Sequence, residues 1–197
     1  MSTYFERPIT PYSLAIDTST GTIEPAGPRL VRRLSDLEGL FRDQDAWRAD
    51  LAVDDRIVYT VASSPVPEID RELPQSVTTI QPGTCGGELY MTKGHQHPNN
   101  QGEIYLGLSG TGGLITYDGE QFAWVDMAPG MMGYIPAGWA HRSVNVGDEP
   151  YSFLAVYPGC AGHDYGWVLE HGLGKRAMKS PGGYDLRPYF ELTGGDR

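Results

Sequence analysis

From Arg56 onward the chain is a succession of short segments rich in β-branched and aromatic residues, most of them separated by Gly, Pro, Asn or Asp. Examples are RIVYTVAS, GELYMTKG, EIYLGLSG, GGLITYDG and FAWVDMAPG, and the segments recur roughly every ten residues. The 26 glycines and 15 prolines among the 197 residues supply many of the breaks. Short strands with short connections favour antiparallel pairing, so the sequence predicts an all-β sandwich or barrel and argues against a helical bundle.

The residues before this region follow another pattern. Residues 1–27 are irregular, with weak alternation in ITPYSLAIDTSTGTIEP, which indicates an extended arm or a short strand. We therefore expect an N-terminal arm with short helices over residues 1–55, packed on a barrel over residues 56–175. The Gly-rich, polar tail at 176–197 is expected to close over an edge or to fray.

Residues 28–53 carry the one convincing helical signal. Hydrophobic residues recur there at helical spacing, at Leu30, Leu34, Leu37 and Phe41. Ser35 followed by Glu38 matches a capping box and predicts a short helix that starts after Ser35. A second short helix is expected after Asp45, through DAWRADLA.

Charge and composition narrow the functional classes. The 15 Lys and Arg residues against 25 Asp and Glu residues give a net charge of −10, without the basic patch that nucleic-acid or anionic-membrane binding requires. Cys85 and Cys160 are too few for a disulfide framework, and unpaired, inert thiols are the expectation. MSTYFERPIT lacks the apolar run of a signal peptide, and no apolar stretch is long enough to predict a spanning helix. The expectation is a soluble cytoplasmic protein.

Three histidines and one glutamate form the strongest chemical signal. His95 and His97 are two residues apart, so on a strand both imidazoles point to the same face. A polar turn follows, and Glu103 opens the next strand, which can return its carboxylate to the same point. His141 begins a later strand after a Pro-Gly turn. Three imidazoles and one carboxylate suit Fe²⁺, Mn²⁺, Ni²⁺, Co²⁺ or Zn²⁺ and leave positions open for substrate or water.

These residues and their spacing resemble the two cupin motifs. The first motif matches at His95, His97, Glu103 and Gly110, with a gap before Glu103 that is slightly longer than the commonest form. The second motif matches completely, at Gly130, Pro136, Gly138, His141 and Asn145. The resemblance implies a cupin β-barrel, an antiparallel jelly roll of two sheets.

The sequence around the motifs is similar to that of the cupin-type, or archaeal-type, glucose-6-phosphate isomerases. The similarity runs from about Leu30 to about Gly174 and includes RLSDLEGLFRD, VTTIQPG, TKGHQH and AGHDYG. It implies a cytoplasmic homodimer with one divalent metal per subunit, iron by preference, and a phosphorylated hexose as substrate. It also implies metal ligands at His95, His97, Glu103 and His141, catalytic roles for Glu103, Tyr157 and His163, and substrate contacts from Thr78, Thr92, Gly94, Tyr105 and Tyr165.

Two mechanisms remain possible with these residues for moving hydrogen between C1 and C2 of the sugar. Glu103 can act as a base in an enediol route, or hydride can pass directly while Tyr157 helps to polarise the oxygens. Lys93 would offset the negative net charge near the phosphate. The alternatives to an isomerase are an iron cupin dioxygenase with the same ligands and a non-enzymatic sugar-binding cupin.

Four neighbouring residues carry structural expectations. His163 could instead be a turn residue bonded to Asp164, or Asp164 could orient a substrate-contacting His163. Arg142 should point out of the barrel by strand alternation, and Asn145 should fix a turn.

Overall fold

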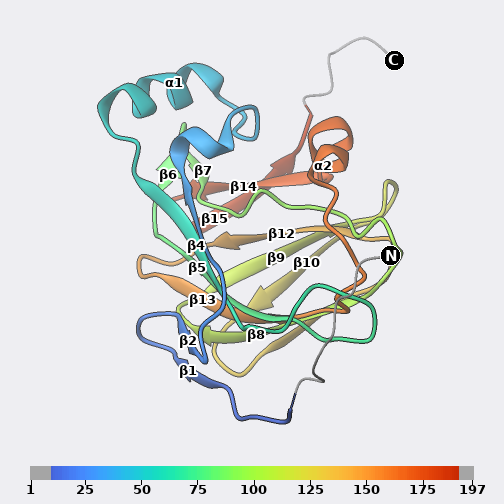
Figure 1. The fold of residues 1–197 in the computed structure, drawn as a ribbon. Coiled ribbons are helices and arrows are strands. Elements are labelled where there is room, and N and C mark those ends of the chain that lie inside the picture. Colours follow the sequence, from blue (N-terminus) through green and yellow to red (C-terminus); the bar gives the residue numbers. More distant parts are fainter. Residues whose placement is uncertain (1–9, 191–197) are drawn as a thin grey trace.

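Two antiparallel sheets face each other around the main hydrophobic core in the computed structural model, which describes residues 10–190 (Figure 1). The larger sheet has six strands in the order β11-β8-β13-β5-β4-β3. These strands are β3 (Arg29–Arg33), β4 (Ile57–Ser63), β5 (Gln75–Ile80), β8 (Glu103–Ser109), β11 (Met132–Ile135) and β13 (Tyr151–Val156). The smaller sheet, in the order β10-β9-β12, consists of β9 (Gly112–Tyr117), β10 (Phe122–Met127) and β12 (Ala140–Asn145). The all-β, antiparallel prediction is confirmed.

Alternation along the strands decides which side chains enter the barrel. In β8 the side chains of Glu103 and Tyr105 are buried, whereas Ile104 between them is exposed. This is the pattern of a strand with one face on the core and the other toward solvent. Glu103 and Tyr105 therefore face the barrel interior together, as the sequence predicted.

A third sheet covers the outer face of β12, in the order β15-β14-β7-β6. Its strands are β6 (Thr84–Cys85), β7 (Glu88–Leu89), β14 (Lys175–Ser180) and β15 (Gly183–Pro188). The tail expected from residue 176 is thus largely a hairpin, whose Met178 pairs with Glu88 of β7. Because this layer packs on it, β12 is buried along its whole length instead of alternating (Figure 1).

The helices differ in position from the sequence prediction. A 3-10 helix spans Leu34–Leu37, and Ser35 is not its cap, because its backbone N–H and hydroxyl bind the Asp55 carboxylate at 2.8 and 2.9 Å. Helix α1 spans Gln44–Val53 and starts before Asp45, since the Asp43 carboxylate accepts the first backbone N–H groups. The capping-box prediction at Ser35 and the start after Asp45 were both wrong.

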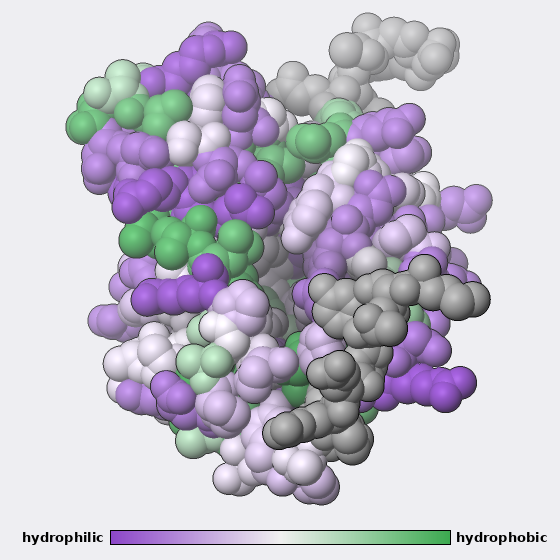
Figure 2. Space-filling view, in the orientation of Figure 1, coloured by the Kyte–Doolittle hydropathy of each residue, from purple (hydrophilic) through white to green (hydrophobic). Residues whose placement is uncertain are grey.

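The remaining elements are a short N-terminal hairpin and one further helix. A short hairpin of β1 (Ala15–Asp17) and β2 (Thr22–Glu24) lies within the expected N-terminal arm, and helix α2 (Tyr165–His171) was not predicted. Parts of the expected arm and tail, at 1–9 and 191–197, lie outside the described residues. Within residues 10–190, no helix has the length and apolar character that crossing a membrane demands. Polar residues cover most of the face drawn in Figure 2, and its apolar residues form separate patches.

Candidate metal centre and substrate pocket

Three separate stretches of chain bring the four predicted metal ligands together at the barrel interior. The segment that carries His95 lies against β12, and His95 and His141 exchange backbone hydrogen bonds of 3.1 and 2.9 Å. His97 follows two residues later, and Glu103 opens β8 in the facing sheet. The nitrogen and oxygen atoms of all four side chains lie within 4.8 Å of one another.

The carboxylate lies at the centre of this group. Oε2 of Glu103 is 3.1 Å from Nε2 of His97, 2.9 Å from Nε2 of His141 and 3.9 Å from Nε2 of His95. Nε2 of His95 is buried and has no hydrogen-bond partner among the described residues. An unpaired buried nitrogen is unfavourable, and a divalent cation bound by this donor set would remove the penalty. The residues present therefore fit a metal of the kind the sequence predicted.

Backbone carbonyls orient two of the imidazoles. Nδ1 of His97 lies 2.7 Å from the carbonyl oxygen of Gly162, and Nδ1 of His141 lies 3.3 Å from that of Trp139. When Nδ1 donates to a carbonyl, Nε2 carries the free lone pair that a metal requires. In both rings Nε2 therefore points toward the Glu103 carboxylate, at the position that a shared metal ion would occupy.

The local electrostatics favour the ligating protonation states at two positions. Burial, together with the nearby imidazoles of His141 and His163, holds the pKa of His95 well below its ordinary value, so this ring stays neutral. Burial alone would raise the pKa of Glu103, but its close contacts with the imidazoles of His141 and His97 lower it. Burial opposes the charged form of His97, yet Glu103 and the Gly162 carbonyl raise its pKa. A carboxylate and a neutral imidazole are the forms that bind metal.

A cavity of about 340 Å³ opens beside the tetrad. His95 and Glu103 reach its wall, and the volume lies within the range of small-molecule sites. All the substrate-contact and catalytic residues that the sequence predicted line the cavity, namely Thr78, Thr92, Gly94, Glu103, Tyr105, Tyr157, His163 and Tyr165. Lys93 lines it as well, whereas His97 and His141 lie behind the wall, buried.

Tyr157 has a partner that sequence reasoning missed. Its hydroxyl donates a 2.7 Å hydrogen bond to Oε1 of Glu68, which also lines the cavity. Burial first, and then the Glu68 carboxylate, raise the pKa of Tyr157, so its hydroxyl stays protonated. Glu68 lies in the irregular stretch SSPVPEID between β4 and β5, where no periodicity or motif marks it.

His163 lies among the rings of the site. Its centroid is 4.5 Å from that of His95 and 5.2 Å from that of Tyr157. Asp164 does not orient it, because Oδ1 of Asp164 accepts from the Trp167 N–H at 3.2 Å and caps α2. Burial lowers the pKa of His163, which favours the neutral ring.

Two further expectations are settled nearby. Asn145 fixes the turn after β12, since its amide donates to the Glu149 carbonyl at 2.9 Å and its oxygen accepts from the Gly147 N–H at 2.9 Å. Cys85 and Cys160 are both unpaired.

An antiparallel barrel with a His-x-His pair, a glutamate and a later histidine around one point defines the cupin class of proteins. A family model described as glucose-6-phosphate isomerase matches residues 31–185, which is most of the chain. The chain therefore belongs to the glucose-6-phosphate isomerase family, in its cupin-type form.

Curated relatives agree with this membership. The chain is 42% identical over 174 residues to a glucose-6-phosphate isomerase of Pyrococcus furiosus, covering 87% of this chain and 92% of the relative. It is 44% identical over 181 residues to the enzyme of the same name from Thermococcus kodakarensis, covering 90% and 93%. A putative glucose-6-phosphate isomerase 2 of Rhizobium meliloti is 35% identical, with 84% of each chain covered.

Among solved structures, an oxalate decarboxylase of Lactobacillus farciminis in a formate complex has a TM-score of 0.44 and 21% identity, covering 54% of this chain and 30% of that one. A likeness at this level is too weak to inform function.

Proposed function

We propose that this protein interconverts glucose 6-phosphate and fructose 6-phosphate, with a divalent metal held by His95, His97, Glu103 and His141. The observation that carries the proposal is the juxtaposition of this tetrad with a cavity lined by two threonines, a glycine and a lysine. A metal ion held by the four ligands would bind the oxygens of a sugar, and the threonines, glycine and lysine of the cavity would bind a phosphate. The family relationship names the reaction.

The phosphate is bound by Thr78, Thr92 and the backbone at Gly94, with Lys93 setting the local potential. The Thr92 hydroxyl accepts a 3.1 Å hydrogen bond from the Ser143 N–H, so its own hydrogen is free to donate to an anion. Lys93 lines the cavity, and burial, followed by the nearby Arg32 charge, lowers its pKa, whereas the Asp36 carboxylate raises it. A local cationic site of this kind offsets the net charge of −10.

The bound ion, which we expect to be iron, would supply Lewis-acid stabilisation of the negative charge that develops on the sugar oxygens. The Tyr157 hydroxyl is protonated and its oxygen is held near these sugar oxygens by Glu68; to donate to the substrate its hydrogen would turn from the Glu68 carboxylate to the sugar. His163 and Tyr165 close the wall beside His95 with ring contacts of 4.5 and 5.8 Å between centroids.

Glu103 is the candidate base for the C2 proton, since it is ionised and reaches the cavity wall. Turnover in deuterated water distinguishes the two routes. Deuterium at C2 of glucose 6-phosphate formed from fructose 6-phosphate supports proton transfer through a base, and its absence removes the main support for Glu103 as base and favours the direct hydride route.

A coupled assay on fructose 6-phosphate tests the activity. The protein is treated with EDTA, and single divalent metals are then added back under nitrogen. Activity restored without oxygen supports the isomerase and contradicts the dioxygenase alternative. A protein that stays inactive with every metal contradicts the proposal.

Thr92→Val tests the phosphate contact. It should raise KM for fructose 6-phosphate far more than it lowers metal content. Thr79→Val is the matched control, because the Thr79 hydroxyl is buried against Ser152 at 2.8 Å and does not line the cavity. An unchanged KM in Thr92→Val would remove Thr92 from the site.

A cytoplasmic homodimer completes the proposal and rests on the family resemblance. Light scattering in solution should give twice the 21.6 kDa chain mass. A mass equal to one chain would contradict the dimer.

A further inference from the structure

The loop that carries Thr92 and Gly94 contains a bulge opposite Arg142. Thr92 donates its N–H to the Ser143 carbonyl at 2.9 Å, and His95 pairs with His141. Between these two pairs the loop has two residues, Lys93 and Gly94, whereas β12 has only Arg142. Lys93 and Gly94 therefore both lie opposite Arg142. Gly94 has φ +77°, the left-handed conformation that glycine adopts readily.

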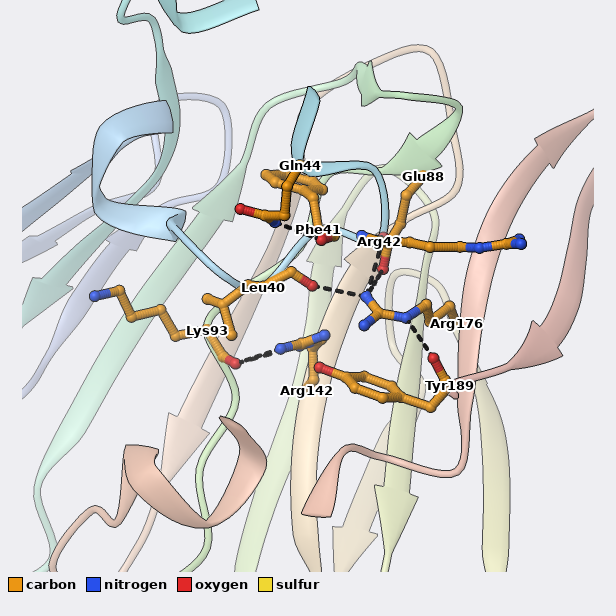
Figure 3. A network of polar contacts seen from close by, with 9 residues as sticks. All are labelled: Leu40, Phe41, Arg42, Gln44, Glu88, Lys93, Arg142, Arg176 and Tyr189. Atoms are coloured by element: carbon orange, nitrogen blue, oxygen red, sulfur yellow. Dashed lines mark hydrogen bonds and ion pairs between the residues drawn. The ribbon is translucent and has the colours of Figure 1, made fainter. Parts of the chain in front are cut away.

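The bulge releases two backbone groups from the ladder. No described residue accepts a hydrogen bond from the Gly94 N–H, and Gly94 lines the cavity. The carbonyl of Lys93 is also outside the ladder, but the Arg142 guanidinium donates to it from Nε at 3.3 Å and Nη2 at 2.7 Å. Figure 3 shows this contact, with the Lys93 side chain pointing away from Arg142.

Arg142 is an unusual residue in this position. It points out of the barrel, as alternation predicted, but the outer layer covers it and leaves it 2% exposed. Among residues 10–190, no carboxylate lies within ion-pair distance of it, whereas the neighbouring Arg176 pairs with Glu88 at 2.9 Å. A Cβ on Gly94 would lie 3.3 Å from Nε of Arg142, so the guanidinium packs directly behind the bulge.

A buried arginine without a carboxylate is costly unless something else stabilises its charge. The Tyr189 ring lies 5.9 Å from the guanidinium carbon of Arg142 and provides a modest cation–π contact (Figure 3). The remaining positive potential falls on the bulge and on the cavity beyond it, where an anion would lower its free energy.

We propose that Arg142 is a positioning residue for the substrate's phosphate. It holds the Lys93 carbonyl so that the bulge keeps the Gly94 N–H and the Thr92 hydroxyl available to the phosphate, and it places a buried positive charge behind them. This inference rests on the proposed function, because it takes the Thr92–Gly94 loop to be the phosphate site.

Titration calorimetry with inorganic phosphate, at constant ionic strength, tests this role without requiring turnover. The variants are Arg142→Gln and Arg142→Lys, and the matched control is Arg176→Gln. Arg176 is a second buried arginine of the same layer, and it donates to the Leu40 and Tyr189 carbonyls and to Glu88 but not to the loop (Figure 3). Metal content and circular dichroism are measured on every sample.

We expect Arg142→Gln to weaken phosphate binding about tenfold or more, because it removes the buried positive charge behind the bulge and the charge-assisted hydrogen bonds to the Lys93 carbonyl. Arg142→Lys should lose less affinity, because it keeps the charge. Arg176→Gln should lower thermal stability and leave the phosphate Kd unchanged. If Arg142→Gln does not fold, a Kd for Arg142→Lys weaker than that of wild type and of Arg176→Gln supports the same conclusion.

Several results would overturn the inference. Equal phosphate affinity in wild type and both Arg142 variants removes the role, and an equal loss in Arg176→Gln reduces it to general packing. Wild-type protein that binds no phosphate also overturns it. Wild-type protein that binds phosphate yet fails to isomerise fructose 6-phosphate contradicts the proposed function instead and leaves the comparison of Kd values to decide the role of Arg142.

Discussion

Gly94→Ala should destabilise the fold more than an ordinary substitution at a left-handed glycine. Gly94 has φ +77°, and Gly130 has a similar φ of +83°. A Cβ on Gly94 would lie 2.9 Å from the His141 carbonyl oxygen and 3.1 Å from Cβ of Arg142, whereas a Cβ on Gly130 would meet nothing within 4 Å. Gly130→Ala is therefore the matched control for backbone strain alone.

The magnitudes follow from this geometry. The left-handed conformation costs an alanine about 1–2 kcal/mol, and the loss of unfolded-state entropy returns about 0.4–1 kcal/mol. We therefore expect Gly130→Ala to lose about 1 kcal/mol. At Gly94 the contacts with backbone and Arg142 add overpacking of about 1–3 kcal/mol, for a total loss of about 2–4 kcal/mol.

Urea unfolding followed by tryptophan fluorescence measures the difference. Both variants are compared with wild type in EDTA, so that metal binding contributes nothing to the free energy of unfolding. Because the clash separates the loop from β12, metal affinity should fall in Gly94→Ala and not in Gly130→Ala. Equal destabilisation of the two variants would refute the close approach of Gly94 to β12.

Three other predictions concern groups outside the pocket. Arg176→Met leaves the buried Glu88 carboxylate without its ion-pair partner, so the free energy of unfolding in urea should fall by about 3–5 kcal/mol. Adding Glu88→Gln should recover part of that loss. If the effects of the two substitutions are purely additive, the pairing is contradicted. Burial raises the pKa of the Cys85 thiol to about 12. At pH 8 a thiol reagent should therefore modify Cys160 first and Cys85 only when the protein unfolds. Rapid labelling of both cysteines in folded protein would contradict the protection of Cys85. Hydrogen bonds from Ser35 lower the pKa of Asp55; its carboxylate therefore stabilises the fold above the unfolded pKa of about 4, and that stabilisation is lost as the pH falls through the lower folded pKa. Asp55→Asn should flatten the acid side of the pH–stability curve, and an unchanged curve would show that this contact contributes nothing.

The metal tetrad could be predicted from sequence because its geometry is local. A separation of two residues on an extended chain fixes the common direction of His95 and His97, and a short turn limits where Glu103 can lie. Only the placement of His141 required a long-range argument, and the completeness of the second motif supplied it. The structure brings all four side chains together.

The outer layer could not be predicted in the same way. Strand alternation predicts that the Arg142 side chain points out of the barrel, but it does not predict that the hairpin of β14 and β15 covers that face. The sequence predicts a tail there because residues 176–197 are Gly-rich and polar, and the burial of Arg176 in the hairpin depends on Glu88, far away in the sequence. Ion pairs of this kind carry no periodic signal.

Local rules also failed where two acceptors compete for one backbone group. Asp43 caps α1, so the helix begins before Asp45 although it was expected to begin after it, and the Asp55 carboxylate binds the groups of Ser35 that a capping box would have used. Glu68 was missed because it reaches Tyr157 from an irregular loop. Such choices depend on tertiary contacts, which a single sequence does not display.

His95, His97, Glu103 and His141 together should hold one catalytic metal ion. Elemental analysis gives the metal bound per chain in wild-type protein and in Glu103→Gln and His141→Ala, after loading with Fe²⁺ under nitrogen and desalting. We predict one ion per chain in the wild type, close to none in either variant, and isomerase activity that follows the metal content. Full metal content in both variants, or an active wild type that contains no metal, would contradict the claim.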